Sequence, residues 1–177
     1  SSSMAGAATG DGTVAIGYTA GNAITNGTGN TVVGYTAAEA LTIGDANTAV
    51  GYQALNLNVQ GSYNTTVGYH AMNKFVAGTQ DHGQNVAVGY QAGFHNVTGQ
   101  YNTYIGTDAG LGATGESNSS NTGVGKQSLY VVEDGSDNVC VGRDSLKALT
   151  SANDNVAVGS AAGNTITTGG TNVCVGY

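Results

Sequence analysis

A column of tyrosines recurs through the chain at nearly fixed spacing. Its members are Tyr18, Tyr35, Tyr52, Tyr69 and Tyr90, and later units place Thr107, Lys126, Arg143, Ser160 and Tyr177 at the same position. Because Lys and Arg are rarely fully buried, we expect this position to be at least half exposed. Rings stacked about 4.8 Å apart form a ladder. A strip that binds sugar or protein is one interpretation, and a structural ladder or a seam between subunits is the other.

Two insertions carry the most varied chemistry of the chain. Four extra residues fall within 72–85, and two fall within 110–121. Insertions in repeat proteins leave the stack as surface loops, often on the binding face. The candidate receptor contacts of the first insertion and the unit after it are Lys74, Phe75, Gln80, Asp81, His82, Gln84, Phe94 and His95. A tolerated insertion without a function is the alternative.

Residues that could support catalysis or hold a metal give only weak signals. The three histidines lack zinc-ligand spacing, and the acidic turn at 133–137 favours solvation over calcium binding. Asp108 and Asp144 could act as the paired carboxylates of a polysaccharide-cleaving enzyme, but they lie two units apart with Gln127 between them. The glycine-rich stretch 110–115 matches a dinucleotide fingerprint by chance, since no strand–helix unit surrounds it. We therefore expect no enzyme, no metal and no cofactor.

The repeat itself defines the elements that position these residues. The signature is Asn-(Thr/Val)-x-(Val/Ile)-Gly, and successive signature glycines are 17 residues apart except for one interval of 21 and one of 19. The glycines are Gly17, Gly34, Gly51, Gly68, Gly89, Gly106, Gly125, Gly142, Gly159 and Gly176. A short fixed period predicts stacked identical units, here a parallel β-solenoid of about ten 17-residue coils.

Within one unit, β-branched residues two apart indicate a strand. We expect this pair to face the interior, and the residue between them to face outward on a closely approached surface. A second short strand is expected after the small residue that follows each signature glycine. If the Thr/Val column points inward, it cannot form the outward Thr array that an ice-binding solenoid needs.

Composition excludes several classes of function. The net charge of −7 and the four scattered cations argue against a nucleic-acid partner. The sequence shows no signal peptide and no long apolar span, so we expect no membrane insertion, and localisation cannot be read from a targeting segment. Proline is absent, as stacked coils require. Cys140 and Cys174 occupy one repeat position two coils apart, too far for a disulfide within the chain, and are expected to be small interior or interface residues.

Two segments carry a resemblance to known families. Asn47-Thr-Ala-Val-Gly-Tyr-Gln-Ala-Leu55 and Asn85-Val-Ala-Val-Gly-Tyr-Gln-Ala-Gly93 resemble the head repeats of trimeric autotransporter adhesins, and resemble still more the repeats of phage tail-fibre-like proteins. The resemblance covers residues 13–177. It implies a left-handed parallel β-roll in a homotrimer, displayed on a virion surface or a cell surface, that attaches to a glycan or protein receptor. The 17-residue coil departs from the shorter adhesin coil and favours the tail-fibre branch.

The chain is interpreted as a lead-in over 1–12, part of which can stem from an expression vector, and one solenoid domain over 13–177. We expect the domain to be a fragment of a longer fibre or adhesin, because open solenoid ends need covering. The expected function is attachment or receptor binding without catalysis. A passive fibre-shaft spacer is the main alternative, and an ice-binding solenoid or a cleaving tailspike fits less well.

Overall fold

The computed structural model describes residues 12–177, which form one column of stacked coils. Each coil contributes a single three-residue strand, and no helix is present between residues 12 and 177. The strands are β1 Val14–Ile16, β2 Thr31–Val33, β3 Thr48–Val50, β4 Thr65–Val67, β5 Val86–Val88, β6 Thr103–Ile105, β7 Thr122–Val124, β8 Val139–Val141, β9 Val156–Val158 and β10 Val173–Val175. The predicted β-solenoid of about ten coils is confirmed.

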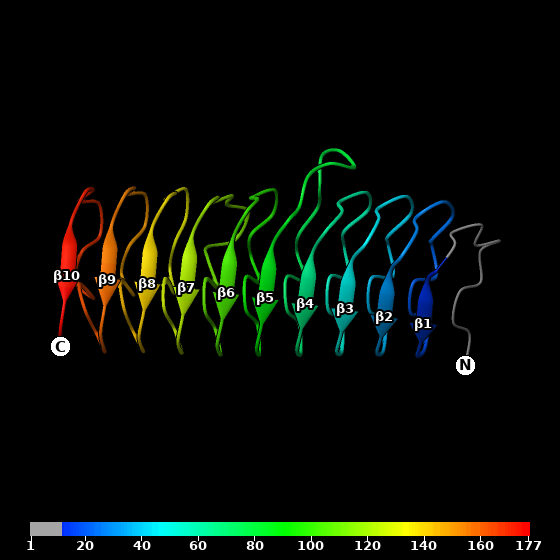
Figure 1. The fold of residues 1–177 in the computed structure, drawn as a ribbon, viewed down its shortest axis with the longest axis horizontal. Helices are drawn as coiled ribbons and strands as arrows, with labels where there is room; N and C mark the ends of the chain where they lie inside the picture. Colours follow the sequence, from blue (N-terminus) through cyan, green and yellow to red (C-terminus); the bar gives the residue numbers. More distant parts are fainter. Residues whose placement is uncertain (1–11) are drawn as a thin grey trace.

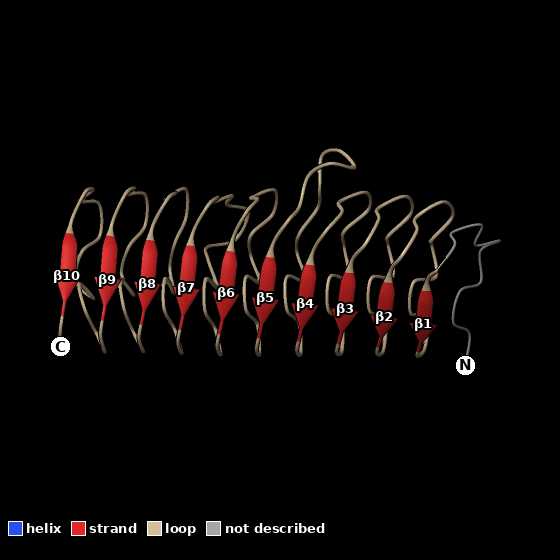
Figure 2. Cartoon of the chain, viewed as in Figure 1, coloured by secondary structure: helices blue, strands red, loops and turns tan. Residues whose placement is uncertain are grey.

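All ten strands belong to one parallel sheet in sequence order, as Figures 1 and 2 show. The register follows the signature: Val14 pairs with Thr31, one 17-residue unit later. The pairing steps over the insertions without slipping, so Thr65 pairs with Val86 and Thr103 with Thr122. The extra residues therefore leave the sheet intact, as expected of insertions in a solenoid.

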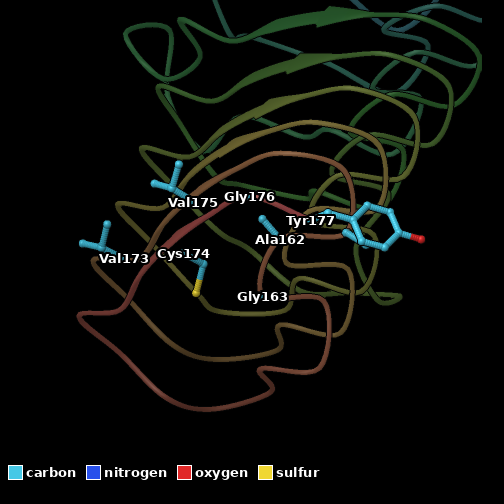
Figure 3. A pocket seen from close by; sticks show the side chains of 8 residues that line it. Ala162, Gly163, Val173, Cys174, Val175, Gly176 and Tyr177 are labelled. Atoms are coloured by element: carbon cyan, nitrogen blue, oxygen red, sulfur yellow. The ribbon is translucent and has the colours of Figure 1, made fainter.

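The orientation of the strand side chains is the reverse of the expectation. The middle residue of β2 to β9 is buried, while the first and third residues are exposed or half-buried in every strand. Figure 3 shows the same alternation in β10, where Cys174 points into the coil and Val173 and Val175 point away. Strand alternation separates two faces without saying which is inside. In most strands the narrow interior takes a small residue, such as Ala49, Ala87 or Ala157.

The second predicted strand of each coil does not form. After the signature glycine, residues with positive φ alternate with ordinary ones, for example Gln53 (φ 54°) and Leu55 (φ 52°). This alternation is incompatible with a strand, but it still aims peptide groups along the column: the Leu55 N–H donates to Ala71 O at 3.0 Å. The far wall of the solenoid is thus a stack of turns held by hydrogen bonds between coils.

The signature glycine is required by close contact between coils. Gly51 has φ +138°, and a Cβ placed on it would lie 2.3 Å from the carbonyl oxygen of Gly68. Neither the conformation nor the space admits a side chain. This contact explains why the glycine is present in all ten units.

A ladder of buried asparagines lines the interior where each strand begins. From Asn30 to Asn155, the Oδ1 of each signature Asn accepts from the backbone N–H of the next signature Asn, as in Asn30 to Asn47 at 2.9 Å and Asn138 to Asn155 at 3.1 Å. The side-chain amides donate to carbonyls of the next turn, such as Asn47 Nδ2 to Gly61 O at 2.9 Å. Every rung thus satisfies buried polar groups that would otherwise destabilise the coil.

Alanines and larger aliphatic side chains fill the rest of the interior, together with one tyrosine. Tyr104 is fully buried at the middle of β6, and its hydroxyl donates to Asn118 Oδ1. A Cβ on Gly110 would lie 2.4 Å from the Tyr104 ring, so this coil makes room by losing a side chain. Cys140 is buried and Cys174 half-buried, and both thiols are free, which agrees with an interior position two coils apart.

Candidate functional site

The tyrosine column forms a continuous stacked ladder along the turn that follows each strand. The ring centroids of consecutive tyrosines are 5.1 Å apart in each of the three pairs between Tyr18 and Tyr69, and 5.5 Å apart between Tyr69 and Tyr90. Interplanar angles lie between 5° and 15°. All five side chains are exposed. The predicted exposure of this position is therefore confirmed at its five tyrosines.

Stacking limits what the ladder can bind. Both faces of Tyr35, Tyr52 and Tyr69 are covered by neighbouring rings, so these residues offer only ring edges and hydroxyls to solvent. A sugar that packs on an aromatic ring needs a free face. Among the rings stacked from Tyr18 to Tyr90, a free face remains only at the ends of the ladder.

A branch of rings leaves the ladder at His70. Its imidazole stacks on Tyr69 with centroids 4.1 Å apart and lies 5.7 Å from Phe94, which meets His95 edge-on at 4.6 Å. The Lys74 amino group lies 5.9 Å from the Phe94 ring centroid. Lys74, Phe94 and His95 are thus brought together as candidates. His70 was not among the predicted contacts, although its position directly after Tyr69 in the repeat could have indicated it.

Burial sets the charge state of the two histidines in this branch. Desolvation, and then the charge of Lys74, lowers the pKa of both His70 and His95 below the ordinary histidine value. Both His70 ring nitrogens are buried without a hydrogen-bond partner. The branch is accordingly a mostly neutral aromatic cluster with one cation at its edge.

The first insertion contributes less to the surface than expected. Phe75 is 0% exposed and belongs to the core, so its assignment as a receptor contact is wrong. It occupies the repeat position of Ile24 and Leu41, which are also buried. The apolar side chain fills the coil before the extra residues begin, and this placement removes it from solvent.

The remainder of the insertion is tied back onto earlier coils. Gln80 Nε2 donates to Ile43 O at 2.9 Å and to Asp45 Oδ2 at 2.8 Å, two coils away. Hydrogen bonds, above all from the Thr28 backbone N–H, lower the pKa of Asp45. The loop rises between β4 and β5 at the end of the coils opposite the tyrosine turn (Figure 1).

The predicted contacts therefore divide into two groups at opposite ends of the coils. Asp81 and Gln84 are exposed on the loop, and His82 is half-buried there. The tyrosine ladder lies at the other end, beside the branch with Phe94. The two groups are therefore two separate candidate surfaces.

The acidic residues do not assemble a catalytic pair. Asp144 is engaged by Lys147 at 3.0 Å and by Arg143 at 3.5 Å. Asp108 accepts from Gln127 Nε2 at 3.4 Å. Asp108 thus makes a polar contact with the next coil and Asp144 makes ion pairs within its own coil, and neither contact marks a general acid beside a nucleophile.

The second acidic group gathers near the second insertion. Repulsion by Asp134 raises the pKa of Glu116 above the ordinary glutamate value. In the described part of the chain, no three His, Cys, Asp or Glu residues form a group that could hold a metal ion. Over the same residues there is no helix long and apolar enough to cross a membrane.

One hollow lies at the C-terminal end of the column, lined by Ala161, Ala162, Gly163 and residues 173–177 (Figure 3). It is the interior of the last described coil, seen where no further coil covers it. Its lining offers no charged side chain. We therefore place the candidate site on the tyrosine turn and not in this hollow.

Comparison of the chain with protein-family models, with curated proteins and with solved structures found no match. The class defined by the fold is a parallel β-solenoid. The exposed surfaces of the solenoid are therefore the features that bear on the role of the chain.

Proposed function

We propose that the chain is a non-enzymatic attachment module of a trimeric fibre or surface adhesin. The observation that carries the proposal is the outer side of the sheet, which we call the strand face: the first and third residues of β1 to β10. Every residue of this face is Val, Ile or Thr, and every one is exposed or half-buried. It carries no charge along its length.

The size of the strand face supports self-association. Ten strands spaced about 4.8 Å apart, with two side-chain columns, give roughly 500 Å² of apolar surface. This area lies within the range of about 300–600 Å² that the largest apolar patch of a soluble monomer covers, and such patches are often interaction sites. A flat face of one repeated residue class fits a copy of itself, and closed symmetric assemblies are the usual result. Three copies are the number that the resemblance to fibre and adhesin repeats implies.

The test is the mass of the protein in solution across a dilution series, measured by sedimentation. The unaltered chain is expected to be a trimer, and Val50→Glu combined with Val67→Glu is expected to yield monomers because it buries charge in the interface. Leu57→Glu is the matched control, since Leu57 is exposed but lies outside the strand face. A monomeric unaltered chain would overturn the trimer.

Attachment is the second half of the proposal and rests on the exposed tyrosine turn. The partner is a glycan or protein receptor, and the location is a virion surface or a cell surface. Binding of the protein to host cells, and its loss on substitution of residues in the turn, would support this half. A trimer that binds no cell and no glycan would contradict it.

A passive spacer is the alternative that one observation favours. The insertion loop is pinned by Gln80 to Ile43 and Asp45, which is the behaviour of a structural brace. Deletion of the four residues 78–81, which restores a 17-residue coil and removes Gln80, with attachment unchanged would favour the spacer, or a binding site elsewhere in the chain.

One observation favours ice binding. The Thr/Val column points outward, whereas the inward orientation expected from the sequence would have excluded an ice-binding Thr array. Thr31, Thr48 and Thr65 form a consecutive run. The companion column, however, holds only Val and Ile, so a paired Thr array is missing. The absence of thermal hysteresis in solutions of the unaltered chain would leave ice binding without support.

A further inference from the structure

The tyrosine ladder stops at Tyr90, and the next two positions of the column carry no ring. Thr107 follows in the next coil and Lys126 in the coil after that. Tyr90 is 47% exposed, and no ring in the described chain covers its face on the Thr107 side. Thr107 is exposed and short. We call the surface formed by Tyr90, Thr107, Asp108 and Lys126 the Tyr90 step.

The dimensions of the Tyr90 step suit one six-membered ring. Two coil spacings separate the backbones at Tyr90 and Lys126, which is roughly 9.6 Å. A ring packed on Tyr90 lies about 3.5–4.0 Å from it, the usual contact distance between carbon atoms. The remaining width admits the Lys126 side chain on the other side. A tyrosine in place of Thr107 would fill this volume, as Tyr69 does beside Tyr90.

The polar groups of the step are available to a ligand. Among residues 12–177, Lys126 has no ion pair or side-chain hydrogen bond, and neither does the Thr107 hydroxyl. Asp108 Oδ2 accepts one long hydrogen bond of 3.4 Å from Gln127, while Oδ1 accepts none. The stacking of His70 on Tyr69 at 4.1 Å shows that side chains at the position of Asp108 lie beside the tyrosine column.

The charges of the step select the chemical class of the ligand. One carboxylate that accepts and one ammonium that donates match a set of hydroxyl groups, each of which can do both. Their charges cancel, and the chain as a whole carries −7, so neither a polyanion nor a cation is favoured. The free ring face of Tyr90 packs against the C–H face of a sugar ring.

We propose that the Tyr90 step binds one neutral pyranose residue of a glycan. Tyr90 stacks on the apolar face of the sugar, Asp108 accepts from its hydroxyls, and Lys126 donates to them. This inference rests on the attachment half of the proposed function and names the ligand class for it. It also explains why a binding site needs the ladder to end, since a covered ring has no face to offer.

The experiment titrates the full chain with neutral methyl glycosides of hexoses and N-acetylhexosamines, up to about 50 mM, because single-sugar sites bind in the millimolar range. Amide shifts of Tyr90, Thr107 and Lys126 report binding by NMR. Thr107→Tyr is the decisive variant: the same position holds Tyr in five consecutive coils, so the repeat itself shows that the substitution fits. Ser160→Tyr is the matched control in the same column.

At least one neutral glycoside is expected to shift these amides, with full loss in Thr107→Tyr and no change in Ser160→Tyr. Asp108→Asn is expected to weaken binding about fivefold, in proportion to one charge-assisted hydrogen bond at a solvated site. Unchanged binding in Thr107→Tyr, no shift with any neutral glycoside, or binding of methyl glucuronide alone would each overturn the inference. A trimer that fails to bind sugar would overturn only this inference, whereas a sugar-binding monomer would overturn only the trimer.

Discussion

Replacement of Asn138 by alanine tests whether the buried asparagine ladder holds the coils together. Asn138 is 0% exposed, and its Nδ2 donates to Asn121 Oδ1 at 3.0 Å and to Ala152 O at 2.9 Å. Its Oδ1 accepts from Asn155 N at 3.1 Å and Asn155 Nδ2 at 2.9 Å. With a further bond from Nδ2 to Ser136 O at 3.0 Å, the side chain makes five hydrogen bonds, three of which share the two Nδ2 hydrogens. Counted as about four full bonds at about 1 kcal/mol each, in a site that water cannot enter, they predict a loss of about 4 kcal/mol in unfolding free energy.

The assay is urea-induced unfolding followed by circular dichroism, with amide hydrogen exchange to locate the change. Solenoid coils contact only their neighbours, so faster exchange is expected first in the coils that contain Asn121 and Asn155. Asn172→Ala is the matched control, because Asn172 is half-buried and its Nδ2 donates to Asn155 Oδ1 and Gly169 O while its Oδ1 accepts nothing in the described chain. The control is expected to lose about 1–2 kcal/mol.

Equal losses in the two variants, or a loss below about 1 kcal/mol for Asn138→Ala, would refute the reasoning. Either result would mean that packing of the small interior side chains, and not the ladder, dominates the attraction between coils.

Three further outcomes follow from the interior and the ring branch. Gly110→Ala is expected to cost about 2 kcal/mol or more beyond the strain of alanine at φ +56°, because its Cβ would meet the Tyr104 ring at 2.4 Å. In a Tyr104→Ala background only that backbone strain, about 1 kcal/mol, should remain, and equal costs in both backgrounds would exclude this contact as the cause. Burial lowers the pKa of His70 below 6.5. The stability present above pH 6.5 is therefore lost as the pH falls through the folded-state pKa of His70. His70→Gln should flatten this part of the pH–stability curve, and an unchanged slope would contradict the lowered pKa of His70. Burial raises the pKa of the Cys140 thiol from 9.0 to about 12. The stability that this burial contributes is therefore complete below pH 9 and is lost as the pH rises towards 12. A thiol reagent at pH 8 should modify the half-buried Cys174 before Cys140, and equal modification rates would show that the coil around Cys140 opens.

The sequence was sufficient for the solenoid, the coil length and the position of each strand, because the Asn and Gly of the signature mark contacts that recur in every coil. It was not sufficient for the side chains that face inward. Val156 and Val158 look like core residues by type, yet the interior accepts Ala157 between them. The asparagines offered a clue: Asn155 shares its face with Ala157, and nine such residues on one face indicate a shared hydrogen-bond ladder.

The turns of the far wall could not be read from residue type. Gln53, Leu55 and Met72 take positive φ, which none of these residues prefers, because the hydrogen bonds between coils impose that conformation.

Within the candidate site, the tyrosine spacing predicted the ladder, but residue type alone misplaced Phe75 on the surface. Its neighbours Lys74 and Val76 do not distinguish core from surface, and only its repeat position relative to Ile24 places it in the core.

The bond from Gln80 to the coil of Ile43 and Asp45 has a mechanical consequence. Elsewhere each coil is joined only to the next, so a force applied to the ends should peel the column one coil at a time. The insertion loop bypasses the coil of residues 52–62, which it also contacts through the bridge between Ser62 and Gly83. Under tension the coils from residue 43 to residue 84 should therefore unfold together in one longer step, and this segment would be the most mechanically resistant part of the column.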